Sequence, residues 1–239
     1  MKIEYMSWTT SELKKKGLIS LNKNFGQAYL VILVCSLIAD VPSVFTVQNG
    51  LFLVRTVKNE IGLSLLLILT VVFIVIPITI GKSRFYLELR DGRGKFPTMW
   101  MLFVQGKTTY FNVIKGMITK YIIVFLGCLI FVIPGIIQYY RVFFVPWLLA
   151  ENPDVNLREV MKQSEQMAKG EKVNIFIMQL SFVGWFLLSF FIADRMNVLI
   201  PSALQSVACV MIYALPLAYY YATVAELYVV LKEKLKNKC

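Results

Sequence analysis

The chain has 239 residues, 58% of them hydrophobic and 16% charged, and its mean hydropathy is +0.66. Soluble domains are usually about 45–50% apolar and about 25% charged, so this composition excludes an ordinary water-soluble domain and favours a protein in lipid. The net charge of +11 comes without a single histidine, which removes the commonest general base and the commonest metal ligand.

Residues 1–25 predict a cytoplasmic segment that contains a short amphipathic helix. Thr9 and Glu12 have the spacing of a capping box, with Thr9 as the N-cap. Apolar residues then alternate with lysines and asparagines, a pattern typical of a helix on a membrane surface. The lysines interrupt any continuous apolar run, so a cleavable signal peptide is not expected.

Four later apolar runs are long enough to cross a bilayer, because a spanning helix needs about 20 mostly apolar residues. They occupy residues 26–45, 61–80, 173–193 and 201–231. Gln179 is a strongly polar residue within the third of these runs. These four segments are the clearest predicted membrane spans.

Residues 116–150 hold enough apolar chain for two short spans, broken at Pro134 and Gly135. Proline removes a backbone donor, and glycine lets the chain bend. The break predicts either a tight helical hairpin or one long kinked helix. Each half has only about 15 apolar residues, which is short for a full crossing, so a re-entrant or tilted pair is a further alternative.

The placement of Lys and Arg favours the hairpin and therefore six spans. With both termini in the cytoplasm, all but four of the 25 basic residues fall on cytoplasmic segments, as is usual in membrane proteins. The four on the outer side are Arg55, Lys58, Arg141 and Arg195. Five spans would remove this bias. Cytoplasmic loops beside an anionic leaflet thus explain the basic charge, and no nucleic-acid partner is expected.

Two cytoplasmic segments carry further signals. Residues 82–115 predict a basic connector with a turn at residues 91–94 and aromatic side chains at headgroup level. Residues 156–170 predict an amphipathic helix, with Asn156 as its N-cap and Gly170 at its C-terminal end.

The chain lacks the motifs of common membrane enzymes. Without histidine it has no H-E-x-x-H zinc site, and no GxxxxGK[ST] phosphate loop occurs. Its four cysteines form no CxxC pair; they are Cys35, Cys128, Cys209 and Cys239. We therefore expect no enzyme activity, no metal and no cofactor.

Three short motifs occur in a distinctive order. Residues 133–137 read IPGII and precede Tyr139 and Tyr140, residues 164–172 read SEQMAKGEK, and residues 180–185 read LSFVGW. This order resembles the uncharacterised membrane-protein family of Gram-positive bacteria known as a domain of unknown function, number 975, over roughly residues 10–232. That family is distantly similar to the membrane domain of some glycerophosphodiester phosphodiesterases. The resemblance implies a helical protein of the cell membrane and no particular reaction.

The sequence therefore predicts an all-α, polytopic membrane protein with about six transmembrane helices plus interfacial amphipathic helices, in a single domain over residues 1–239. The transmembrane bundle occupies residues 26–231, and residues 232–239 form a basic cytoplasmic tail.

We expect a non-enzymatic transport or cell-envelope component. The alternative is an immunity-type protein that protects the membrane from a membrane-active peptide. The expected partners are the lipid bilayer with its anionic inner leaflet and a membrane protein such as an exporter. Because broken short helices often carry transporter sites, the candidate ligand path or hinge consists of Pro134, Gly135, Tyr139, Tyr140, Arg141 and Gln179.

Overall fold

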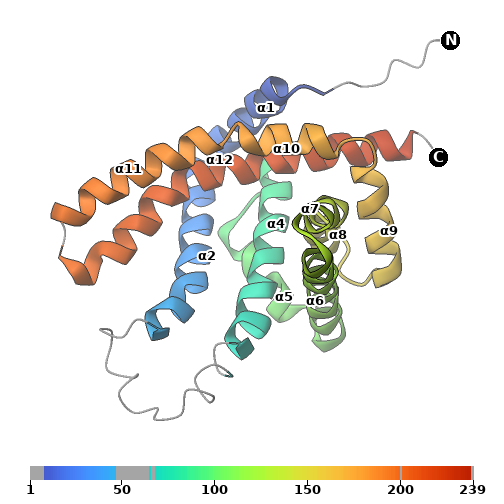
Figure 1. Ribbon diagram of the computed structural model, residues 1–239, viewed down its shortest axis with the longest axis horizontal. Helices are drawn as coiled ribbons and strands as arrows, with labels where there is room; N and C mark the ends of the chain where they lie inside the picture. Colours follow the sequence, from blue (N-terminus) through green and yellow to red (C-terminus); the bar gives the residue numbers. More distant parts are fainter. Residues whose placement is uncertain (1–7, 47–64, 66–67, 200, 238–239) are drawn as a thin grey trace.

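A computed structural model describes residues 8–46, 65, 68–199 and 201–237 of the chain. These residues form helices and connecting turns, with no strand among them (Figure 1). The predicted loop with Arg55 and Lys58 lies outside the described residues, as does the first part of the 61–80 run. The predicted all-α class is confirmed.

In chain order the helices are α1 (Thr10–Lys23), α2 (Phe25–Thr46), a π-helical turn (Val71–Val75), α4 (Ile76–Arg90), a 3-10 helix (Phe96–Trp100), α5 (Met101–Val104), α6 (Lys107–Ile130), α7 (Val132–Arg141), α8 (Val145–Glu151), α9 (Leu157–Ala168), α10 (Lys172–Leu180), α11 (Val183–Leu199) and α12 (Ser202–Lys236). Within the described residues, 5 helical stretches are long and apolar enough to cross a membrane. The α1–α2 pair, bent by 97°, would make up to 6. This confirms the prediction of about six transmembrane helices.

The long helices pair into three hairpins, namely α2 with α4, α6 with α7, and α11 with α12. In Figure 1, α11 and α12 run side by side along the long axis of the molecule, whereas α2 and α4 run across it. The hairpins therefore splay from a shared base instead of forming one parallel bundle. The base contains α1, α8 and the C-terminal half of α12, each of which contacts α4.

The α6–α7 hairpin turns at Phe131, three residues before the predicted break. Phe131 has an extended backbone, and Pro134 falls in the first turn of α7, where a missing N–H is tolerated. A Cβ added to Gly135 would lie 2.3 Å from Cys128 Sγ, so glycine permits the close approach of the two helices. Residues 130–133 are between 70% and 74% exposed, which leaves an apolar tip for lipid. The structure thus selects the tight hairpin over the long kinked helix.

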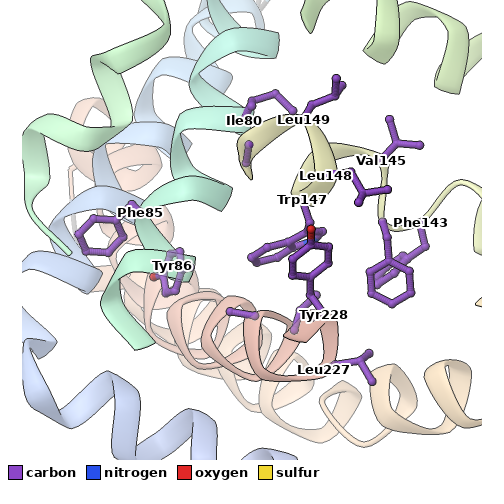
Figure 2. Packing of buried hydrophobic residues seen from close by; sticks show 14 of the residues in the cluster. Ile80, Phe85, Tyr86, Phe143, Val145, Trp147, Leu148, Leu149, Leu227 and Tyr228 are labelled. Carbon is purple, nitrogen blue, oxygen red and sulfur yellow. The ribbon is translucent and has the colours of Figure 1, made fainter. Parts of the chain in front are cut away.

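An aromatic core joins the helices at the base (Figure 2). Trp147 of α8 stacks on Tyr228 of α12 with 6.2 Å between ring centroids, and Phe144 lies 6.2 Å from the same tyrosine. Tyr86 of α4 is buried, and its hydroxyl donates to the carbonyl of Ala28 in α2 at 3.0 Å. These aromatic contacts and the Tyr86 hydrogen bond fix α2, α4, α8 and α12 to one another.

α1 confirms the predicted amphipathic helix and packs its small residues against α12. Thr9 is the N-cap, and its hydroxyl accepts from the Glu12 backbone N–H at 3.3 Å. A Cβ added to Gly17 would lie 2.8 Å from Thr223 Oγ1 and 2.9 Å from its Cα. The two helices can therefore cross this closely only because residue 17 has no side chain.

Glu226 of α12 is the most buried carboxylate of the base, with 5% of its surface exposed. It accepts from the Ser20 hydroxyl of α1 at 2.7 Å and from Arg90 Nε of α4 at 3.0 Å. Burying a charge is costly unless the charge is paired and hydrogen-bonded. The two partners offset that cost and hold three helices at one point.

Two further ion pairs extend from the end of α12 to other elements. Lys232 pairs with Glu151 at the end of α8. Lys234 pairs with Glu171, the buried residue before α10, at 2.5 Å. The C-terminal half of α12 thus contacts α4, α8 and the start of α10 through charged side chains.

The predicted start of the basic connector at residue 82 is wrong. α4 continues to Arg90, and Lys82 lies inside the helix with 8% of its surface exposed. The first charge after an apolar run marks a membrane boundary only where no neighbouring helix covers it. Here the neighbouring helices cover Lys82, so the charge is buried.

The prediction that Arg141 lies on the opposite side from the 156–170 helix is also wrong. Arg141 Nη2 lies 2.7 Å from Glu165 Oε2 of α9. The chain has already turned at Phe131, so α7 carries Arg141 back toward α9. The predicted caps of α9 are confirmed, since Asn156 accepts from the Arg158 backbone N–H at 3.0 Å and Gly170 has a φ of +82°.

The crossing of α1 and α12 generates the first prediction. Gly17→Ala should lower the thermal unfolding midpoint in mild detergent, because the added methyl group must push α1 away from Thr223 at a cost of about 1–3 kcal/mol. Gly26→Ala is the matched control, since a Cβ there meets nothing within 4 Å. Equal midpoints for the two variants would contradict the close crossing.

The second prediction concerns pH. Burial raises the pKa of the Glu171 carboxyl, but hydrogen bonds from Lys234 and Asn174 outweigh it and hold the pKa below its ordinary value. A carboxyl of this kind stabilises the fold above its unfolded-state pKa, and the stabilisation is lost as the pH falls through its folded-state pKa. Glu171→Gln should therefore lower the unfolding midpoint at neutral pH and flatten its fall below about pH 5.

The matched control for this experiment is Glu233→Gln, which changes an exposed carboxyl of α12. Thermal unfolding followed by intrinsic fluorescence between about pH 7 and pH 3 covers the range in which carboxyl groups titrate. A Glu171→Gln profile that coincides with the control would show that the Lys234 pair does not stabilise the base.

Candidate functional site

Polar and ionisable side chains within membrane spans are candidates for function, because lipid penalises them. The structure gathers such residues where the three hairpins meet. We call this set the polar cluster. It consists of Lys82 of α4, Tyr139 and Tyr140 of α7, Gln179 of α10, and Tyr220 and Tyr221 of α12.

Gln179 is the hub of the polar cluster. Its carbonyl accepts from the Tyr140 hydroxyl at 2.7 Å. Its amide group donates to the hydroxyls of Tyr220 at 2.9 Å and of Tyr139 at 3.4 Å. Since a glutamine side chain offers one carbonyl and two N–H donors, these contacts use all of its groups and join α7, α10 and α12.

Three consecutive tyrosines of α12 face three different elements, because successive residues of a helix point about 100° apart. The Tyr219 hydroxyl donates to the Lys14 carbonyl of α1 at 3.3 Å. Tyr220 bonds Gln179 as described, and Tyr221 faces Lys82. The run Tyr219 to Tyr221 thus connects the N-terminal helix, the hub and the buried lysine.

Lys82 is the only charge in the polar cluster. Its ammonium lies 4.0 Å from the centroid of the Tyr221 ring, and the ion pairs of the described residues give it no acidic partner. A desolvated cation over an aromatic ring gains about 2 kcal/mol. Tyr86 and Trp147 surround the same ring, with centroids at 5.7 Å and 6.3 Å.

The local packing of α4 explains why Lys82 is buried. At the preceding Gly81, an added Cβ would lie 2.0 Å from the Met99 carbonyl oxygen. This glycine therefore lets the 3-10 helix lie directly against α4. The contact covers one side of α4, while α2 and α12 pack against the same helix.

Three of the six residues proposed from the sequence lie together, namely Tyr139, Tyr140 and Gln179. Arg141 instead pairs with Glu165 outside the polar cluster. Pro134 and Gly135 lie near the tip of the α6–α7 hairpin and do not contribute to it. The six residues therefore belong to three places rather than one.

Sequence reasoning missed Lys82, Tyr220 and Tyr221. Lys82 directly follows an apolar run, a pattern that predicts a loop at the membrane boundary. The two tyrosines carried a usable signal, since three consecutive tyrosines inside a predicted span place hydroxyl groups on three sides of one helix.

The chemistry available to the polar cluster is one cation, several phenol groups and one amide. Among the described residues, no group of three His, Cys, Asp or Glu side chains could hold a metal ion. The polar cluster can neutralise an anion and donate hydrogen bonds to it.

A second polar feature is a cleft of about 580 Å³ at the base, between α4, α8 and the end of α12. Its charged lining is largely paired within itself. Arg84 bonds Glu88 at 3.2 Å, and Lys232 pairs with Glu151. The charges of the cleft are therefore mostly paired, whereas Lys82 of the polar cluster has no acidic partner among the described residues.

A family model matches residues 52–234, which is most of the chain and includes every member of the polar cluster. No curated protein and no solved structure matches the chain. The family match confirms the resemblance seen in the three sequence motifs and assigns no role to the residues. The chain belongs to the family described as Protein of unknown function (DUF975).

Proposed function

We propose that this protein is a non-enzymatic transport or cell-envelope component of the cell membrane, and that the polar cluster binds a small anion. The observation that carries the proposal is the buried ammonium of Lys82, which has no acidic partner in the described part of the chain.

An anionic ligand would supply the charge that Lys82 lacks. Taking an ammonium group out of water costs several kcal/mol, and the Tyr221 ring returns only about 2 kcal/mol of it. A carboxylate or phosphate group beside Lys82 would pair with the ammonium. The hydroxyls of Tyr139 and Tyr220, which accept from the Gln179 amide, would then donate hydrogen bonds to the anion.

The place of the polar cluster supports a role in transport. Its members come from α4, α7, α10 and α12, so each of the three hairpins contributes a side chain. Transporters commonly bind substrates where helices of different repeats or bundles meet near mid-membrane, and they open by moving one bundle against another. A change in the splay of the hairpins would open or close this cluster.

We also propose that the base faces the cytoplasm, with both termini on that side. The base carries the lysines of α1 and of the end of α12, and basic residues of this kind are typical of cytoplasmic segments.

The third prediction is that Lys82→Met lowers anion uptake into proteoliposomes at least about tenfold, because a charge-assisted contact contributes about 1.5–3 kcal/mol. Radiolabelled acetate, glutamate, inorganic phosphate and glycerol phosphate serve as the substrates. Gln179→Leu should also lower uptake, since it removes the hub of the hydrogen-bond network.

The matched control is Lys95→Met, which removes an equal charge at an exposed position. Uptake that is unchanged in Lys82→Met, or absent for every anion in the wild-type protein, would contradict the proposal. In that case the alternative function, an immunity-type protein that protects the membrane from a membrane-active peptide, would be tested next. That role predicts that expression raises the concentration of membrane-active peptide that sensitive cells survive, whatever residue stands at position 82.

A further inference from the structure

We propose that the groove between the α6–α7 hairpin and α9 holds one anionic phospholipid. In this arrangement the lipid phosphate lies at Arg158 and Lys162, and an acyl chain lies along Leu126 and Ile130. The proposal goes beyond the anion-binding function and is independent of it, because none of these residues belongs to the polar cluster.

The groove has a volume of about 510 Å³ and two different walls. One wall is apolar and comes from the hairpin, with Leu126 and Ile130 exposed by 53% and 71%. The other wall is α9, which presents Arg158 and Lys162 on the same side. These two are one helical turn apart, a spacing that places side chains next to each other. The groove therefore combines a surface for an acyl chain with a surface for an anion.

The charges along the groove leave an excess of two cations. Arg141 and Glu165 also line it, but they pair with each other at 2.7 Å and cancel. The side chains of Arg158 and Lys162 are exposed and have no acidic partner among the described residues. A phosphodiester group would complement this excess.

The positive surface continues along α9. A second hollow of about 610 Å³ shares Lys162 and Glu165 with the groove and adds Lys169 and Lys172. Basic side chains beside a membrane surface attract anionic lipids. A headgroup at Lys162 would thus lie within a broader field of the same sign.

The wall formed by α9 is held firmly in place. The Ser164 hydroxyl is buried, donates to the Arg141 carbonyl at 3.0 Å, and accepts from the Phe144 backbone N–H at 3.2 Å. These bonds fix α9 against the end of α7. A site that is already formed before binding loses less entropy on binding, which favours a resident lipid over a passing contact.

A phospholipid fits this groove better than a soluble anion does. A soluble anion would use only the two cations and leave the apolar wall of the hairpin unfilled. The cations lie on α9, while Ile130 marks the end of the groove toward the hairpin tip. This order, with charge at one end and apolar surface at the other, matches the order of headgroup and chain in a lipid.

The test uses the full chain in phosphatidylcholine vesicles that contain spin-labelled phosphatidylglycerol or spin-labelled phosphatidylcholine. Electron paramagnetic resonance measures the fraction of each lipid that the protein immobilises. The wild-type protein should prefer phosphatidylglycerol. Arg158→Gln with Lys162→Gln should lower this preference at least about fivefold. The control Lys15→Gln with Lys95→Gln removes the same charge at exposed sites elsewhere and should keep the preference.

Two outcomes would overturn the proposal. If both double variants lose the preference equally, the protein attracts anionic lipid only through its total charge. If neither loses it, the groove plays no part. A competition with excess glycerol 1-phosphate then tests the apolar wall. The phosphate alone should fail to displace the spin-labelled lipid, and full displacement would show that the acyl chain contributes nothing.

Discussion

The carboxylate of Glu226 lies at the point where α1, α4 and α12 meet, and the base of the molecule depends on its two bonds. It accepts from Ser20 of α1 and from Arg90 of α4 at hydrogen-bond distance. A carboxylate buried among helices has little water to bond, so each partner must come from the protein. This need determines how α1 and α4 lie against α12, and the second half of α12 then positions the ion pairs to α8 and α10.

A base fixed in this way lets the apolar ends of the hairpins spread apart. Outside water, apolar side chains gain little from packing on one another, because lipid is equally apolar. The tip of the α6–α7 hairpin is accordingly exposed, whereas the aromatic side chains at the base are buried. Close helix contacts occur where a glycine permits them, as at Gly17, Gly81 and Gly135. The polar cluster lies between the hairpins, so its geometry depends on how they are joined at the base.

The sequence predicted those features that depend on local patterns. The capped starts of α1 and α9 follow from Thr9 and Asn156, and the spans follow from the length of the apolar runs. The sequence predicted that Gln179 and the tyrosines after Pro134 belong to one candidate ligand path. It did not predict the hydrogen bonds between them. The burial of Lys82 and the turn of Arg141 toward Glu165 depend on contacts between distant segments. Hydropathy along one chain carries no information about such contacts, so both residues were assigned to the wrong environment.

The two proposed sites have different origins in the same architecture. The polar cluster arises because each hairpin brings a polar side chain to the centre, and Lys82 gives that centre its charge. The lipid groove arises because α9 lies beside an exposed hairpin and carries more cations than it can pair. Either site can fail without affecting the other, since they share no residue.

The most direct measurement of the central claim is a double-mutant cycle on Arg90→Gln and Glu226→Gln, read by unfolding in mild detergent. The account predicts that each single variant destabilises the protein. It also predicts that the double variant loses less than the sum of the two, with a coupling free energy of about 1–3 kcal/mol. Strictly additive losses would show that the two charges do not act on each other, and that Glu226 does not hold the base together.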